Sequence, residues 1–228
     1  DKIMEISANT VNILKNFASI NSNIVIKPGQ KLMTISEAKN ILAEAAIPEK
    51  FSTLIGIYDL QEFLNVLNLV DTPRIQLDQS YMHVSSQSGR EVVKYYYADT
   101  EMLTTPNKPI VMPEEDVWFN LDVNTLNSIK RAAGIFSHGE LMIEPSEGCV
   151  KLSVVDPENA SANTYSVEVD GDYKDQSFKY ILNIANLRMV SDDYKVKISK
   201  KLISQFTNEA GNLTYWIALE KSSKHGDK

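Results

Sequence analysis

Cations and amides at helical spacing are the side chains of this sequence that are best placed to bind a ligand. A helix is predicted over residues 123–135, and Asn127, Lys130, Arg131 and Gly134 share one of its faces. That face has two cations, an amide and no carboxylate, whereas an ordinary exposed helix mixes both signs. Sparse cations among uncharged amides suit loose contact with a phosphate backbone, without readout of bases.

The same pattern occurs near the start of the chain, in a predicted helix over residues 8–20. Lys15 corresponds to Lys130, and the two segments are offset by 115 residues, about half of the chain. The other coincidences are Asn9/Asn124, Thr10/Thr125, Asn12/Asn127, Ala18/Ala133 and Ile20/Ile135. Arg131 is matched by Asn16, so the two copies are not equally basic. The repeat favours two similar domains.

Apolar stripes behind capping residues predict four helices in all. Ser7, Asp59, Asp122 and Asn183 are N-cap residue types, and they precede helices predicted over 8–20, from residue 60 onward, over 123–135 and over 184–190, the last with Arg188 facing outward. The apolar segments between these helices predict strands at 24–26, 31–35, 51–57, 74–77, 81–84, 92–97, 117–121, 140–143, 149–154, 164–169, 179–182, 194–199 and 214–219, with 39–47 ambiguous. Each half therefore runs helix, strands, helix, strands, which indicates an α+β fold.

A proline-rich stretch separates the two halves. Residues 104–113 contain three of the eight prolines of the chain, a composition typical of an extended and fairly stiff linker. We therefore expect an N-terminal domain over 1–105, a linker over 106–113 and a C-terminal domain over 114–228.

The distribution of charge matters more here than its total. The net charge is −7, which by itself argues against binding to nucleic acid. The four predicted helices, without their caps, carry four cations against Glu62 alone, a net of +3 that leaves −10 for the rest of the chain. If the helices share one surface, that surface attracts a polyanion while the others repel it.

Signals for catalysis, metals and cofactors are weak. His83, His138 and His225 have no Cys or His partner at ligand spacing, and no phosphate-binding glycine loop or nucleophile elbow occurs. Glu114-Glu115-Asp116 reads better as a solvated linker end than as a metal site. The single cysteine, Cys149, cannot form an internal disulfide, and we expect a buried thiol in a reducing compartment. We expect neither a membrane span nor a secretory leader.

Several segments, in order along nearly the whole chain, resemble one known family. They are Asn16–Ser22, Ile57–Leu60 running on to Phe63 and Leu67, Pro106–Ile110, Ile181–Met189 and Ala218–Glu220. Together they look like the sliding clamp, or DNA polymerase processivity factor, of T-even-type bacteriophages. The segments 36–52 and 71–101 do not match clearly.

The resemblance implies a ring of identical subunits, each with two similar processivity-fold domains in which two helices pack on antiparallel sheets. The helices would line a central hole, so that Lys15, Lys130, Arg131 and Arg188 face duplex DNA, with Lys2 as a further contact. Helices about 10 Å apart and twelve in number leave roughly 28 Å clear, whereas eight leave only about 15 Å. The groove depths of DNA alone sum to about 16 Å, so three subunits form the smallest sufficient ring.

The resemblance also implies partners. Hydrophobic tails of the DNA polymerase and other factors, including late-transcription factors, would bind near the linker, where Pro109, Ile110, Val111 and Met112 are apolar. Burial of these side chains against the chain's own domains is the competing interpretation. An ATP-dependent clamp loader is implied too, because a closed ring cannot thread circular DNA unaided. The expected location is the cytoplasm of an infected bacterial host, and no cofactor is expected.

Two other functions compete with a clamp. A non-catalytic, β-rich phage structural or adaptor protein would also accommodate duplicated domains. A Mg²⁺-dependent nuclease would require carboxylates that converge on the basic helices, and the faces of those helices have almost none. The sequence therefore favours a non-enzymatic clamp.

Overall fold

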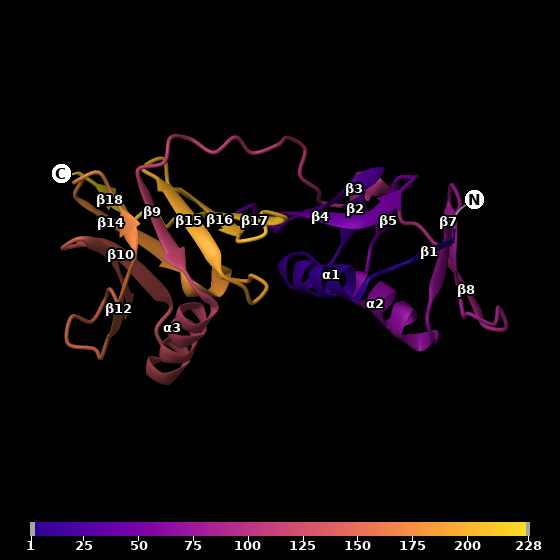
Figure 1. Cartoon of the computed structure of the whole chain (residues 1–228), viewed down its shortest axis with the longest axis horizontal. Coiled ribbons are helices and arrows are strands. Elements are labelled where there is room, and N and C mark those ends of the chain that lie inside the picture. Colours follow the sequence, from indigo (N-terminus) through magenta and orange to yellow (C-terminus); the bar gives the residue numbers. More distant parts are fainter. Residues whose placement is uncertain (1–2, 227–228) are drawn as a thin grey trace. The chain divides into compact units, whose positions relative to one another are not determined.

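The computed structural model describes residues 3–226 and divides into two compact units, Asp1–Pro109 (unit 1) and Ile110–Lys228 (unit 2). Both units combine helices with antiparallel sheets (Figure 1), which confirms the predicted α+β class. Residues 104–115, between the last element of unit 1 and the first strand of unit 2, form no helix or strand. Each unit is described separately below.

Unit 1 contains two α-helices, one short 3-10 helix and eight strands. Four strands form a sheet in the order β1-β6-β7-β8, β2 pairs with β5, and β3 pairs with β4. The elements are β1 Ile3–Glu5, α1 Ala8–Ile20, β2 Ile24–Ile26, β3 Gly29–Ile35, β4 Ile41–Phe51, β5 Ile55–Ile57, α2 Leu60–Leu69, β6 Arg74–Leu77, β7 Tyr81–Ser85, β8 Val92–Tyr96 and η1 Thr100–Met102.

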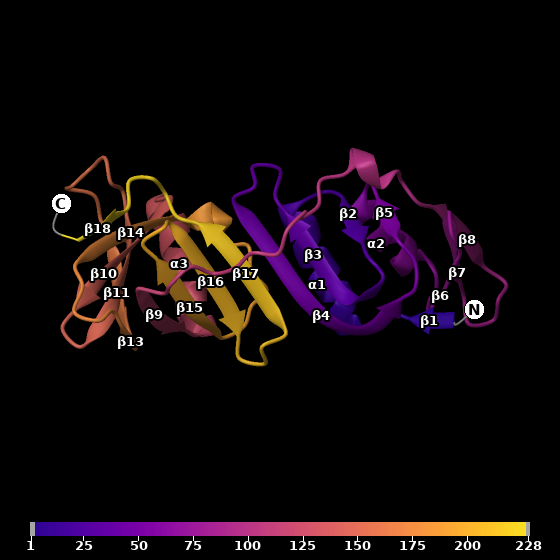
Figure 2. The ribbon, with the colours of Figure 1, turned by 90° about the horizontal axis from the view of Figure 1, so that it is seen from above.

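The two helices of unit 1 cover different strands. Helix α1 packs on β3 and β4, as both views in Figures 1 and 2 show. Helix α2 lies against α1 and reaches the four-stranded sheet, where the rings of Phe63 and Tyr95 are 5.5 Å apart. The end of α1 meets the start of α2, because the Leu60 N–H donates to the Ser22 carbonyl at 2.8 Å. Ile20, at the end of α1, is buried.

Unit 2 contains one α-helix and two antiparallel sheets. One sheet has the order β13-β9-β15-β16-β17 and the other has the order β12-β11-β10-β14-β18. The elements are β9 Val117–Leu121, α3 Val123–Phe136, β10 Glu140–Ser146, β11 Cys149–Val155, β12 Tyr165–Val169, β13 Gly171–Asp172, β14 Phe178–Asn183, η2 Ile184–Asn186, β15 Tyr194–Ser199, β16 Ile203–Asn208, β17 Leu213–Ala218 and β18 Lys224–His225. Helix α3 contacts β11 and β12.

The fourth predicted helix, over 184–190, is wrong in length and type. Asn183 caps as predicted, since its side chain accepts from the Ala185 N–H, but only the 3-10 helix η2 follows. The helix does not continue beyond η2, because two tyrosines form hydrogen bonds with the backbone of Val190. The Val190 N–H donates to the Tyr215 hydroxyl at 3.1 Å, and its carbonyl accepts from the Tyr194 hydroxyl at 2.5 Å. Those bonds replace the helical ones that Val190 would otherwise make.

The start of η2 in unit 2 nevertheless corresponds to the start of α2 in unit 1. The Ile184 N–H donates to the Gly139 carbonyl at 2.9 Å, just after α3, as the Leu60 N–H does to Ser22 just after α1. On α3, Ile135 is 76% exposed, although its counterpart Ile20 on α1 is buried. The repeat therefore survives in topology, while the packing of the two units has diverged.

Three strands of unit 2 were not predicted: the two-residue strands β13 and β18, and the longer strand β16. The buried face of β16 has Ser204, Phe206 and Asn208, so two of its three inward positions are polar. Both polar side chains are satisfied: the Ser204 hydroxyl donates to the Ile217 carbonyl, and the Asn208 side chain bonds Asn212 and Leu213. Apolar alternation could not reveal such a strand. The ambiguous region of unit 1, residues 39–47, lies mostly in β4, and the strand predicted over 51–57 corresponds to the last residue of β4 and to β5.

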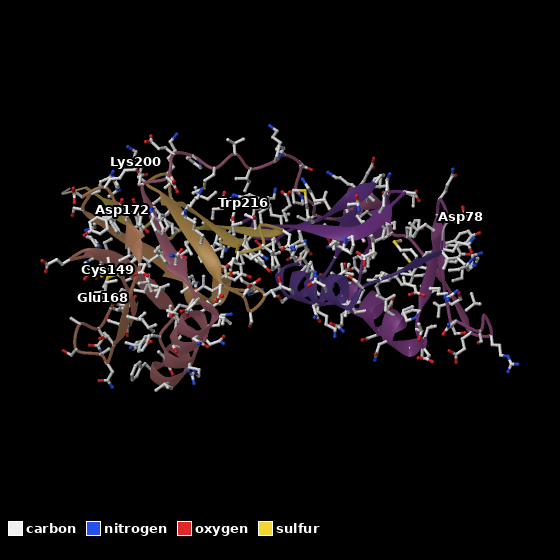
Figure 3. All side chains as sticks on the ribbon, in the orientation of Figure 1. Asp78, Cys149, Glu168, Asp172, Lys200 and Trp216 are labelled. Atoms are coloured by element: carbon white, nitrogen blue, oxygen red, sulfur yellow. The ribbon has the colours of Figure 1, made fainter. Side chains whose placement is uncertain are left out.

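Two further expectations concern exposure and membranes. Cys149 is a free thiol on β11 (Figure 3), and it is half-buried rather than buried. Among the described residues, no helix has the length and apolar content to cross a bilayer.

Candidate nucleic-acid interface

Helix α1 presents the polar face that its sequence predicts. Ser7 caps it, accepting from the Thr10 N–H, and Lys15 is exposed along with Asn12 and Ser19. The buried stripe consists of Thr10, Ile13, Leu14, Phe17 and Ile20; Val11 and Ala18, which were expected inward, are half-buried. One free cation on a mostly neutral face can attract a phosphate without a fixed geometry.

A hollow of about 240 Å³ opens beside Lys15, between α1 and the start of α2. A cation, two hydroxyls, an amide and a carboxylate share it. It is lined by Lys15, Ala18, Ser19, Ser22, Asp59 and Gln61.

Helix α3 has the more basic face. Asp122 caps it, accepting from the Thr125 N–H at 2.7 Å, and that bond lowers the pKa of the Asp122 carboxyl. Lys130 and Arg131 are both exposed as predicted, and Arg131 Nη2 donates to the Ser128 hydroxyl at 3.3 Å. Desolvation lowers the pKa of Lys130, because the amine lies close to the protein although its side chain is exposed. The exposed face of α3 therefore carries two adjacent cations, Lys130 and Arg131.

Arg188 is exposed as predicted, but no α-helix presents it. It follows η2, and its Nε donates to the Ala185 carbonyl at 3.0 Å. The structure thus places Lys130, Arg131 and Arg188 on unit 2 and Lys15 on unit 1. Lys2 lies outside the described residues.

Sequence reasoning missed two carboxylates at the N-termini of the basic helices. Glu49, at the end of β4, is buried and accepts from the Ser7 N–H at 2.7 Å and from the Thr10 hydroxyl at 2.6 Å. Burial would raise the pKa of Glu49, but the hydrogen bonds from Thr10 and Ser7 outweigh it and lower the pKa. At the start of α3, the Asp193 carboxylate likewise accepts a hydrogen bond, from the Val123 N–H at 2.8 Å.

These carboxylates determine whether the N-termini of α1 and α3 can bind a phosphate. A free helix N-terminus is an anion site, because its N–H groups and dipole favour negative charge. In α1 and α3 that end already has a carboxylate from a distant strand or turn, so a phosphate would depend on the lysines and the arginine instead. No signal in the sequence joins Glu49 to Ser7, which lies 42 residues earlier.

The apolar linker residues lie at the surface rather than in a core. Val111 is 85% exposed and Pro109 is exposed, while Ile110 and Met112 are half-buried. Within residues 3–226, no group of three or more His, Cys, Asp or Glu side chains is arranged to hold a metal ion.

Two family matches cover most of the chain. The family described as DNA polymerase processivity factor matches residues 7–105, and the family described as gp45 sliding clamp, C terminal, matches residues 118–221. The sliding clamp of Enterobacteria phage T4 is 31% identical over 229 residues, which cover 97% of this chain and 99% of that protein. The sliding clamp of Vibrio phage KVP40 is 29% identical over 222 residues, covering 95% and 99%.

Solved structures share the fold at low sequence identity. PCNA from Thermococcus kodakaraensis superposes with a TM-score of 0.72 and 16% identity, covering 96% of this chain and 99% of that one. A Helicobacter pylori beta clamp has a TM-score of 0.68 and 15% identity, covering 95% and 65%. Because the phage T4 relative spans nearly the whole chain and both halves match a clamp family, this chain belongs to the sliding clamps, the non-catalytic processivity factors of DNA polymerases.

Proposed function

We propose that this clamp assembles as a homotrimeric ring around duplex DNA and tethers the replicative DNA polymerase for processive synthesis. One observation carries the proposal: Lys15 of α1 and Lys130 of α3, at matching positions of the repeat, are both exposed on faces whose other side chains are mostly neutral. About a dozen cations per ring would share a weak, sequence-independent attraction to the phosphates, which suits sliding.

Self-association is supported by two of the strands that end sheets, one in each unit. Within the described residues, β8 ends the four-stranded sheet of unit 1 and β12 ends a sheet of unit 2. Each has five residues, and an unpaired strand of that length is a template for pairing. Val92 and Tyr96 on β8 are 57% and 63% exposed, and Glu168 projects from β12 (Figure 3). We propose that β8 of one subunit pairs with β12 of the next, a heterologous contact that closes into a ring.

The helices beside those edges support the same contact. Leu69 on α2 is 72% exposed and Ile135 on α3 is 76% exposed, although both are large and aliphatic. A neighbouring subunit would bury them. Counted over residues 3–226, three copies supply nine α-helices rather than the expected twelve, with η2 in the fourth position of each subunit. The estimate of three subunits used twelve helices, so it requires η2 to occupy the same width along the wall of the hole as an α-helix.

Partner binding is the second part of the proposal. Surface exposure of Pro109 and Val111 leaves the apolar linker accessible, so we propose that the segment Pro109–Met112 contributes to a pocket for hydrophobic tails of the polymerase and of late-transcription factors. An ATP-dependent clamp loader would open the ring, and the clamp would act in the cytoplasm of the infected bacterial host.

Retention on circular DNA tests the ring. Clamp loaded on a nicked circle should remain bound and should escape when the circle is linearised, and its mass in solution should be that of three chains. Equal retention on circular and linear DNA would refute encirclement.

Lys130→Ala with Arg131→Ala tests the DNA-facing residues. Removing two phosphate contacts per subunit should weaken the salt dependence of DNA retention without changing the oligomeric state. An unchanged salt dependence would refute the assignment of these two residues.

A further inference from the structure

The hollow between α1 and α2 contains two opposite charges at its surface. Lys15 comes from the middle of α1, and Asp59 caps α2, accepting from the Glu62 N–H at 3.0 Å. Both side chains are exposed. The remaining polar groups, Ser19, Ser22 and Gln61, are neutral.

A phosphate oxygen would find attraction and repulsion together here. The Lys15 ammonium and the side chains of Ser22 and Gln61 could donate hydrogen bonds to it, and the volume of about 240 Å³ admits a phosphate group. The Asp59 carboxylate offers only acceptors and carries the same sign as the phosphate. Both charged groups are exposed, and water weakens their interaction with a phosphate, so neither the attraction nor the repulsion is large.

We propose that Asp59 limits how long a DNA phosphate stays in this hollow, so that Lys15 attracts the backbone without holding it. The inference rests on the proposed position of α1 facing DNA and names the phosphate contact of that face. A clamp must bind the backbone yet leave each phosphate quickly, and a carboxylate beside the cation reduces the depth of each binding minimum.

Capping explains the presence of an aspartate at position 59, but it does not require the charge. Asn is as good an N-cap as Asp, because its side-chain oxygen accepts the same N–H. Asp59→Asn therefore separates the repulsion from the cap. Asp99→Asn is the matched control: Asp99 also caps a short helix, accepting from the Glu101 N–H at 3.0 Å, and is exposed, but lies outside the hollow.

The experiment measures binding of a fluorescent linear duplex by the full-length assembled clamp over a series of salt concentrations. Asp59→Asn should bind about threefold more tightly per contacting subunit at low salt, as expected for a unit charge about 7 Å from a phosphate in water. The gain should shrink as salt is added. Diffusion along stretched duplex should slow by a similar factor, while the unfolding midpoint stays within about 2 °C of wild type.

Asp99→Asn should leave DNA affinity unchanged. If Asp59→Asn binds no more tightly than wild type, or if both variants gain equally through net charge, the inference is overturned. Lys15→Ala separates this result from the proposed function: it should weaken binding, and unchanged binding would instead refute the DNA-facing position of α1.

Discussion

Glu49 is predicted to be one of the most sensitive single positions for the stability of unit 1. Glu49 is 7% exposed, and its carboxylate joins the end of β4 to the start of α1 through Ser7 and Thr10. Each hydrogen bond to a buried charged group contributes about 1.5–3 kcal/mol, so Glu49→Ala should lower the free energy of unfolding by about 3–5 kcal/mol.

Glu49→Gln should cost less, about 1–2 kcal/mol. The glutamine oxygen can still accept from the Ser7 N–H, and its amide can donate to the Thr10 hydroxyl oxygen, so both partners stay bonded and only the charge is lost. Ser7→Ala is a useful comparison, because it removes the cap hydroxyl while leaving both Glu49 contacts possible, and it should cost about 1 kcal/mol.

The effect of Glu49 should depend on pH. Its folded pKa is lowered from 4.5, so the unfolded state binds the proton more readily and stability rises with pH in that window. The contribution is fully present above about pH 5 and is lost as pH falls through the folded pKa. Urea unfolding between pH 3 and pH 7 measures it, and the gap between wild type and Glu49→Gln should narrow in acid. A Glu49→Ala variant within 1 kcal/mol of wild type at pH 7 would refute the reasoning.

Three further variants test packing and the end of η2. Gly56→Ala should destabilise unit 1 by about 2 kcal/mol or more, because an added Cβ would lie 2.4 Å from the Ala98 carbonyl oxygen. At Gly139 an added Cβ meets open space, so Gly139→Ala should change the free energy of unfolding by less than about 0.5 kcal/mol. Thermal unfolding of the two variants measures the difference. Tyr215→Phe should cost about 1–2 kcal/mol in urea unfolding, since it leaves the Val190 N–H unpaired, and a cost near zero would show that the segment after η2 is held by other contacts.

Local signals were enough to predict α1 and α3 nearly to the residue. Ser7 and Asp122 cap as expected, and the cations Lys15, Lys130 and Arg131 are exposed as the helical spacing requires. These predictions succeeded because cap, stripe and polar face all depend on residues within a few turns.

Contacts between distant segments account for the failures. The helix over 184–190 was lost to hydrogen bonds between the Val190 backbone and the hydroxyls of Tyr194 and Tyr215, which periodicity cannot detect. Strand β16 was missed because Ser204 and Asn208 face its interior. The carboxylate of Glu49 reaches α1 from a strand whose sequence was ambiguous. The exposed polar faces of α1 and α3 could thus be predicted, but the carboxylates that bond their N-termini could not.

The divergence between Ile20 and Ile135 makes the two halves of the polypeptide non-interchangeable. Ile20 is 6% exposed within unit 1, whereas Ile135 is 76% exposed on unit 2. In the β8–β12 contact proposed above, a surface of unit 2 on one copy would meet a surface of unit 1 on the next, so the two contacting surfaces would be unlike. A contact of that kind would orient every copy in the same sense around the assembly, so the two faces of the assembly would differ and a partner protein could distinguish them.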